Sequence, residues 1–230
     1  MLDLQHVEFS IGSFALRAHW ALKPGAHLAV IGPSGAGKST LLAGIAGFTD
    51  QASGRCLWNA GILSDRPDKR PVAMLFQDHN LFPHLSVSQN VGLGLQPTTR
   101  LTQAEQNKID AALQNVGLDG LGKRRPAQLS GGQQSRVALA RVLVMARPII
   151  LLDEPFSALG PAQRAQMLNL VKSVANQLDA LLIMVTHDPG EARALGGFAC
   201  FVENGVAHPP VEAETFFNDP PQGMRDYIGL

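Results

Sequence analysis

The chain has 230 residues, of which 45% are hydrophobic and 17% charged, and its formal net charge is zero. This composition is typical of a folded globular protein rather than a disordered one. There is no excess of basic residues to bind duplex nucleic acid, so we expect no nucleic-acid partner. The sequence begins without the features of a signal peptide, and no stretch reaches the roughly 18 uninterrupted apolar residues of a membrane span.

The first third of the chain has the pattern of strands and turns, with one helix. The helix is expected to begin near Lys38, because apolar residues recur there at helical spacing, and to end at Gly47. Pro24-Gly25 marks a turn between two of the apolar segments. The strands predicted in this part are residues 16–23, 27–31, 54–59 and 72–76.

The middle of the chain, residues 86–146, has a helical pattern punctuated by glycine and proline. The last third then alternates: an apolar strand at 149–152, a helix after Pro161 and a second apolar strand at 180–185. Apolar strands that alternate with helices are typical of a buried parallel sheet. The sequence therefore predicts an α/β core interrupted by a mainly helical insertion.

Residues 32–39 match the phosphate-loop pattern G-x-x-x-x-G-K-[ST] in full, between an apolar strand and a helix, as that motif requires. Its glycines let backbone N–H groups converge on phosphate oxygens, and the helix N-terminus adds partial positive charge. We expect Lys38 to reach the β- and γ-phosphates and the Ser39 hydroxyl to bind Mg²⁺. The expected ATP contacts are Gly32, Pro33, Ser34, Gly35, Ala36, Gly37, Lys38, Ser39 and Thr40.

A second motif, Leu129-Ser130-Gly131-Gly132-Gln133, precedes a long helical segment. Ser130 and Gln133 have the spacing of a capping box, so an ordinary capped helix is one interpretation. Together with the following residues 134–141, however, the motif closely resembles the signature of ABC-type ATPases. In that family the signature of one subunit clamps the γ-phosphate held by the phosphate loop of the other.

This resemblance implies a P-loop NTPase (RecA-like) ABC ATPase core, with an antiparallel β portion and an inserted helical subdomain. The whole chain, 1–230, then forms a single ABC ATPase domain, with the core at about 1–79 and 136–230 and the helical subdomain at about 80–135. It also implies a homodimer in which Ser130, Gly131, Gly132 and Gln133 contact ATP in trans.

Two acids, Asp153 and Glu154, follow the apolar strand at 149–152. They are expected to bind Mg²⁺ and to polarise the attacking water, respectively; the alternative is that they simply face solvent. Gln77 resembles the family's Q-loop glutamine, which senses Mg²⁺ and water. His187 resembles the switch histidine that contacts the γ-phosphate. The expected catalytic residues are thus Glu154, His187 and Gln77, and the expected Mg²⁺ ligands Ser39, Gln77 and Asp153.

Two further positions bear on the site. The family stacks an aromatic residue of the first strand region on adenine, and Phe9 is the expected residue here, with Phe14 as the alternative. Residues 157–160 resemble the family's D-loop, but Gly160 stands where an aspartate is usual. We expect that substitution to weaken coupling between the two ATP sites of the dimer.

Segments 70–77 and 80–87 resemble those of bacterial importer ATPases, which dock a helix of an integral membrane permease there. Leu81, Phe82, Pro83 and His84 are therefore candidate docking residues, although local core packing explains them equally well. Within the importers, residues 74–77 and 89–95 look most like thiamine-importer ATPases; iron(III), polyamine or other small-solute importers, or a non-transport ABC ATPase, are the alternatives. The resemblance implies a peripheral position on the cytoplasmic face of the inner membrane and indirect work with a periplasmic solute-binding protein.

Overall fold

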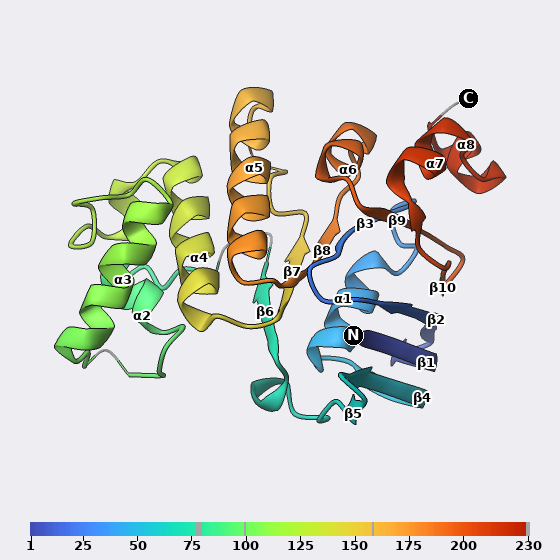
Figure 1. Cartoon of the computed structure of the whole chain (residues 1–230), viewed down its shortest axis with the longest axis horizontal. Helices are drawn as coiled ribbons and strands as arrows, with labels where there is room; N and C mark the ends of the chain where they lie inside the picture. The colour runs from blue at the N-terminus through green and yellow to red at the C-terminus, as the bar shows by residue number, and fades with distance from the viewer. Residues whose placement is uncertain (77–79, 99, 158, 229–230) are drawn as a thin grey trace.

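The computed structural model describes residues 1–76, 80–98, 100–157 and 159–228. A sheet with a parallel and an antiparallel half runs through the molecule in the strand order β5-β4-β1-β2-β10-β9-β3-β8-β7-β6, and β11 pairs with β9 (Figure 1). The parallel strands are β3 (His27–Ile31), β6 (Val72–Leu75), β7 (Ile149–Asp153), β8 (Leu181–Val185) and β9 (Phe198–Glu203). The others are β1 (Leu2–Ile11), β2 (Phe14–Leu22), β4 (Asp50–Trp58), β5 (Gly61–Ile62), β10 (Val206–Ala207) and β11 (Val211–Glu212).

The parallel strands separate two hydrophobic cores, because successive side chains of a strand point to opposite faces. In β7, Ile149 and Leu151 belong to one core and Ile150 and Leu152 to the other, and all four are fully buried. A strand buried on both faces has a continuous apolar sequence, which explains why β7 and β8 could be predicted closely.

The first core encloses helix α1 (Lys38–Ala46). This helix packs between the parallel strands β6 and β7 and the antiparallel strands β1 and β4. Gly44 of α1 lies directly against the ring of Phe9, where a Cβ atom would overlap the ring. This contact holds the antiparallel half of the sheet against α1, the helix that follows the phosphate loop.

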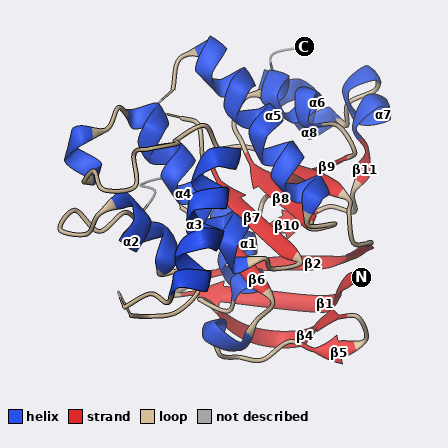
Figure 2. Cartoon of the chain, turned by 60° about the vertical axis from the view of Figure 1, so that its left-hand side comes forward, coloured by secondary structure: helices blue, strands red, loops and turns tan. Residues whose placement is uncertain are grey.

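The second core lies under the remaining helices of the opposite face (Figure 2). These are α2 (Val87–Gly92), α3 (Gln103–Asn115), α4 (Gly131–Met145), α5 (Pro161–Gln177), α6 (Pro189–Leu195), α7 (Ala213–Asn218) and α8 (Gln222–Ile228). Helices α2, α3 and α4 pack on one another and form one side of the molecule, away from β1, β2 and β4 (Figure 1). Each of the three begins with a capping box, which satisfies otherwise unpaired N–H groups at its first turn.

The predicted α/β core with a helical insertion is confirmed, and the predicted strand at 27–31 coincides with β3. The strand predicted from residue 16 begins earlier, at Phe14, and the one predicted from 54 begins at Asp50. Helix α4 runs through residue 135, so the proposed boundary of the helical subdomain falls inside a continuous helix. Within the described ranges, no helix is both long and apolar enough to cross a membrane.

Candidate nucleotide-binding and hydrolysis site

The predicted phosphate loop connects β3 to α1 in a conformation that its glycines make possible. Gly35 and Gly37 have φ values of 76° and 110°, in the region that residues with a Cβ rarely adopt. Gly37 is the N-cap of α1 and makes no side-chain cap, so the first N–H groups of this helix remain available. A helix N-terminus with uncapped N–H groups next to a glycine-rich loop is suited to binding phosphate.

The side chain of Lys38 folds back onto the backbone of the phosphate loop. Its Nζ donates to the carbonyl oxygens of Gly32 and Pro33, each at 2.8 Å, and the side chain is buried. Burial lowers the pKa of Lys38, while the charges of Glu154 and Asp153 oppose that shift. The ammonium group is thus held inside the loop and can exchange carbonyl partners for phosphate oxygens.

Ser39 and Asp153 meet at the carboxyl end of β7. The Ser39 Oγ donates to Asp153 Oδ1 at 3.1 Å. Burial raises the pKa of the Asp153 carboxyl, and the bond from Ser39 partly offsets that shift. A hydroxyl and a carboxylate are oxygen ligands of the kind that Mg²⁺ prefers, so these two residues fit the predicted metal role.

Glu154 and His187 lie side by side beyond the ends of β7 and β8. Oε2 of Glu154 is 3.3 Å from Nδ1 of His187. The Glu154 backbone has φ 44°, in the left-handed region, and its N–H donates to the carbonyl of Val185 at 3.1 Å. A left-handed conformation is uncommon for a residue with a Cβ, and such positions are concentrated at functional sites, so Glu154 remains a candidate functional residue. Gln77, the third predicted catalytic residue, lies outside the described residues.

The prediction that Phe9 stacks on adenine is contradicted by its position. Phe9 has no exposed surface and packs on Gly44 inside the first core. Its place in the burial alternation of β1 turns its ring inward, which the sequence pattern around it already indicated. Phe14 is instead partly exposed and lies against the phosphate loop, where a Cβ on Gly37 would come within 2.9 Å of its ring.

The signature motif caps α4 as predicted. Ser130 Oγ accepts from the N–H of Gln133 at 3.3 Å, and Gln133 Oε1 accepts from the N–H of Ser130 at 3.0 Å. Ser130 and Gly131 are exposed, and a Cβ on Gly131 would meet nothing within 4 Å. Over the residues that can be described, no hydrogen bond joins the signature to the phosphate loop. The exposed surfaces of Ser130 and Gly131 leave the N-terminus of α4 accessible.

Only part of the predicted docking segment lines a groove. Leu81 and Phe82 border a cavity of about 480 Å³, and 47% of Phe82 is exposed. Pro83 and His84 are exposed but lie outside that lining, and the His84 ring meets the Phe82 ring edge-on. The rest of the lining comes from β6, the segment that follows it and α4: Met74, Leu75, Phe76, Asn80, Ala138, Arg141, Val142 and Met145.

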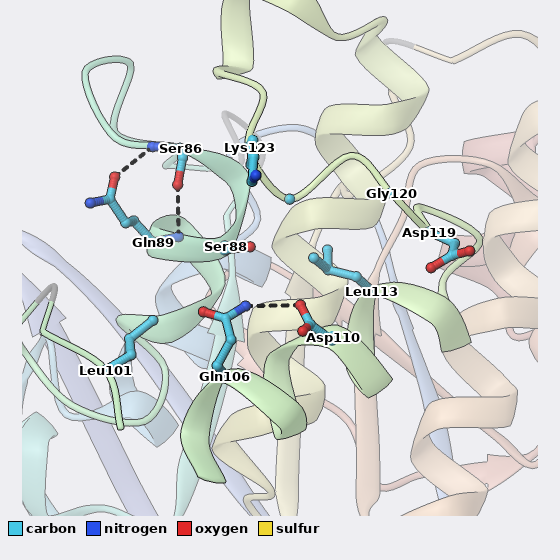
Figure 3. A pocket seen from close by; sticks show the side chains of 11 residues that line it. Ser86, Ser88, Gln89, Leu101, Gln106, Asp110, Leu113, Asp119, Gly120 and Lys123 are labelled. Atoms are coloured by element: carbon cyan, nitrogen blue, oxygen red, sulfur yellow. Dashed lines mark hydrogen bonds between the residues drawn. The ribbon is translucent and has the colours of Figure 1, made fainter. Parts of the chain in front are cut away.

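A larger hollow of about 1100 Å³ lies elsewhere, between α2, α3 and the loop before α4 (Figure 3). Several of its polar side chains already have partners: Ser86 and Gln89 each accept from the other's backbone N–H, and the Gln106 amide donates to Asp110 at 2.8 Å. None of the residues predicted to contact ATP lines it. We therefore place the candidate site at the phosphate loop rather than in this hollow.

Sequence reasoning missed the polar side chains that support these loops. The fully buried Asn90 bonds the backbone N–H and C=O of Phe82, and Arg141 bonds Asn90. Tyr227 donates to the carbonyl of His187 at 3.4 Å, and burial, then the charge of Glu154, raises its pKa. A polar residue among the apolar positions of a short helix was the available signal for Asn90; the contact of Tyr227 has no local signal.

The chain belongs to the ABC transporter family, whose model matches residues 16–157. As a member of that family it is an ATP-binding protein and an ATPase. The thiamine import ATP-binding protein ThiQ of Ruegeria sp. (strain TM1040) is 49% identical over 230 residues, which cover 100% of both chains. The protein of the same name from Cereibacter sphaeroides is 50% identical over 230 residues, again covering 100% of both.

Solved structures agree with this assignment of the fold. The chain superposes on cbiO1 from Clostridium perfringens, part of the ABC transporter complex cbiONQ, with a TM-score of 0.82, 26% identity and coverage of 95% of this chain and 90% of that one. The dimeric post-hydrolysis structure of the ATP-binding cassette MJ0796 bound to ADP and Pi gives a TM-score of 0.77 at 27% identity, covering 93% and 99%. The fold is thus that of an ABC ATPase cassette.

Proposed function

We propose that this chain is the ATP-hydrolysing subunit of a bacterial importer of thiamine. Thiamine is proposed as the substrate because the chain is 49% and 50% identical, over its full length, to two thiamine import ATP-binding proteins. No residue of this chain need touch thiamine, because a solute-binding protein and membrane subunits recognise the solute in such importers. This subunit would act at the cytoplasmic face of the inner membrane.

The active unit in this proposal is a homodimer. Each ATP lies between the phosphate loop of one copy and residues 130–133 of the other. The exposed, side-chain-free surface of Gly131 supports this arrangement, since it lets a phosphate approach the N-terminus of α4 closely. The dimeric cassette bound to ADP and Pi, which has the same fold, supports it as well.

Hydrolysis in each site begins with positioning. Lys38 and the N–H groups at the start of α1 hold the phosphates, and Ser39 and Asp153 would hold Mg²⁺. The bound ion supplies positive charge that offsets the negative charge of the phosphates. Phe14 would contact the adenine ring, in place of the buried Phe9.

Glu154 then orients a water molecule and accepts its proton as the water oxygen bonds to the γ-phosphorus. The bond from that phosphorus to the bridging oxygen breaks, and ADP leaves with the electron pair. His187 holds the Glu154 carboxylate and donates to the γ-phosphate. Most of the rate gain comes from positioning and charge stabilisation, as in other phosphoryl transfers.

The groove bordered by Leu81 and Phe82 is the proposed contact with the integral membrane permease. Its apolar lining and the exposed ring of Phe82 are suited to an apolar helix face. Closure of the ATPase dimer would draw the two docked permease segments together. The periplasmic solute-binding protein acts through the permease only.

The test is uptake of labelled thiamine by the native host after deletion of the gene for this chain. We expect uptake to fall, to be restored by the parent chain, and not to be restored by the Glu154→Gln variant. Uptake of iron(III) and of a polyamine is measured in the same strains. Unchanged thiamine uptake with loss of either other solute would contradict the proposed substrate but leave the ATPase intact.

A further inference from the structure

Arg164 of α5 lies between the loop that follows β7 and the loop that follows β8. Its Nε donates to the carbonyl of Leu159 at 2.8 Å, and its Nη2 to the carbonyl of Ser157 at 3.5 Å. Its Nη1 lies 3.5 Å from Asp188 Oδ2 and 3.7 Å from Glu191 Oε1. One guanidinium group therefore joins the loop that begins with Glu154 to the segment just after His187.

The acidic partners of Arg164 are tied to the residue directly before His187. Thr186 is buried, and its Oγ1 donates to Oε2 of Glu191 at 2.6 Å. The Thr186 Oγ1 also accepts a hydrogen bond from the N–H of Asp188 at 3.1 Å. The two neighbours of His187 in the chain are thus both bonded within one network that ends at Arg164.

We propose that Arg164 is a positioning residue that holds the loop after β7 and the loop after β8 in fixed register, so that Glu154 and His187 stay aligned during hydrolysis. This inference rests on the roles proposed above for Glu154 and His187. Arg164 itself touches neither side chain and acts through the backbone of one loop and the acids of the other.

An arginine is suited to this task because its planar fork directs several donors at once. Nε makes the short hydrogen bond, to the Leu159 carbonyl at 2.8 Å, and Nη2 faces the Ser157 carbonyl at 3.5 Å. Nη1 forms ion pairs with the Asp188 and Glu191 carboxylates at 3.5 and 3.7 Å. A lysine ammonium is a point charge on a flexible stem and cannot hold both loops in this geometry. Gly160, the N-cap of α5, has no side chain and so cannot make such a link itself.

The contact is not simply what keeps α5 in place. Apolar residues of that helix, among them Met167, Leu168 and Val171, are buried in the second core. A second cation, Lys172, also links α5 to α6, since its Nζ donates to the carbonyl of Ala194 at 2.9 Å. Lys172 lies two turns further along α5 than Arg164, and its link reaches the far end of α6, so it offers a matched control.

The experiment compares steady-state ATP hydrolysis by Arg164→Ala, Glu191→Gln, their double variant, Lys172→Ala and His187→Ala. We expect Arg164→Ala and Glu191→Gln each to lower kcat about tenfold, while KM for ATP changes less than about twofold. The double variant should be no slower than the slower single variant, because both changes break one link. Lys172→Ala should hydrolyse ATP like the parent.

Two controls keep the outcome clear. Thermal unfolding is measured for each variant, to show that it is folded. If Arg164→Ala does not fold, Arg164→Lys replaces it, since lysine retains the charge but not the planar fork. The kcat of Arg164→Lys should also fall. Parental kcat in the Arg164 variant beside an impaired His187→Ala, or losses that multiply in the double variant, would overturn the inference. An unimpaired His187→Ala would overturn the proposed function instead.

Discussion

Nδ1 of His187 lies 3.3 Å from Oε2 of Glu154, at the ends of two neighbouring parallel strands. The register of those strands explains the contact: Asp153 of β7 pairs with Val185 of β8, so the residues that follow each of them are brought together. The N–H of Glu154 bonds the carbonyl of Val185 and fixes the turn. The strand register and this backbone bond therefore hold Glu154 and His187 side by side.

Glu154→Gln should lower the rate of ATP hydrolysis by a factor of about 10²–10⁴, because the amide cannot accept a proton from water. ATP binding should persist, so the variant should remain as a dimer with Mg·ATP, detectable by size-exclusion chromatography. Glu203→Gln is the matched control, since Glu203 also lies 3.3 Å from a histidine, His208, in another part of the molecule. Equal rates for the two variants would contradict the role of Glu154.

Ser39→Ala removes the hydroxyl that bonds Asp153. If Ser39 is a ligand of the metal, the Mg²⁺ concentration for half-maximal hydrolysis should rise about tenfold or more. A magnesium titration at saturating ATP measures it. Ser64→Ala is the control, because its hydroxyl is partly exposed and accepts from the N–H of Arg66. The same magnesium requirement in both variants would speak against the proposed ligand.

Phe14→Ala and Phe9→Ala should have opposite consequences. Loss of the Phe14 ring should raise KM for ATP about tenfold, since stacking of an aromatic ring on a base contributes about 1–3 kcal/mol. Loss of the fully buried Phe9 ring should lower the free energy of unfolding by about 3–5 kcal/mol. Steady-state kinetics and chemical denaturation distinguish the two effects. If Phe9→Ala folds and raises KM while Phe14→Ala does not, Phe9 rather than Phe14 stacks on adenine.

Gly160→Asp restores the carboxylate usual at this position in the family. Gly160 is the N-cap of α5 with φ −70° and ψ 160°, and a Cβ there would meet nothing within 4 Å, so aspartate fits without strain. As an N-cap it should stabilise the fold by a few tenths of a kcal/mol. We also expect tighter ATP-driven dimerisation, measured by analytical ultracentrifugation; unchanged hydrolysis and unchanged dimerisation would refute weakened coupling.

The stability of the fold should decrease in mildly acidic solution because of His27, at the start of β3. Burial, and then the charge of Lys172, lower its pKa in the folded state. As the pH falls below about 6.5, the unfolded chain takes up a proton before the folded chain does, so the free energy of unfolding decreases. His27→Leu should reduce the slope of melting temperature against pH between pH 7 and 5; parallel slopes would count against this.

Local patterns in the sequence predicted the parts of the site that depend on neighbours along the chain. The phosphate loop with Lys38, the cap made by Ser130 and Gln133, and the apolar strand before Asp153 are all short-range features. The prediction for Phe9 was wrong because it rested on the presence of an aromatic residue in the first strand region. The alternation of buried and exposed residues in β1 turns that ring into the core. The links made by Arg164 and Tyr227, and the bond from Arg141 to Asn90, could not be predicted, since each joins segments that only packing brings together.

Complementation between two inactive variants tests the composite site most directly. Lys38→Ala disables the phosphate loop and Ser130→Arg obstructs the signature, so each should hydrolyse little ATP alone. Mixed, they form a heterodimer in which the intact phosphate loop of one copy faces the intact signature of the other. Our account predicts that mixing restores part of the parental hydrolysis rate; a mixture as inactive as its components would contradict it.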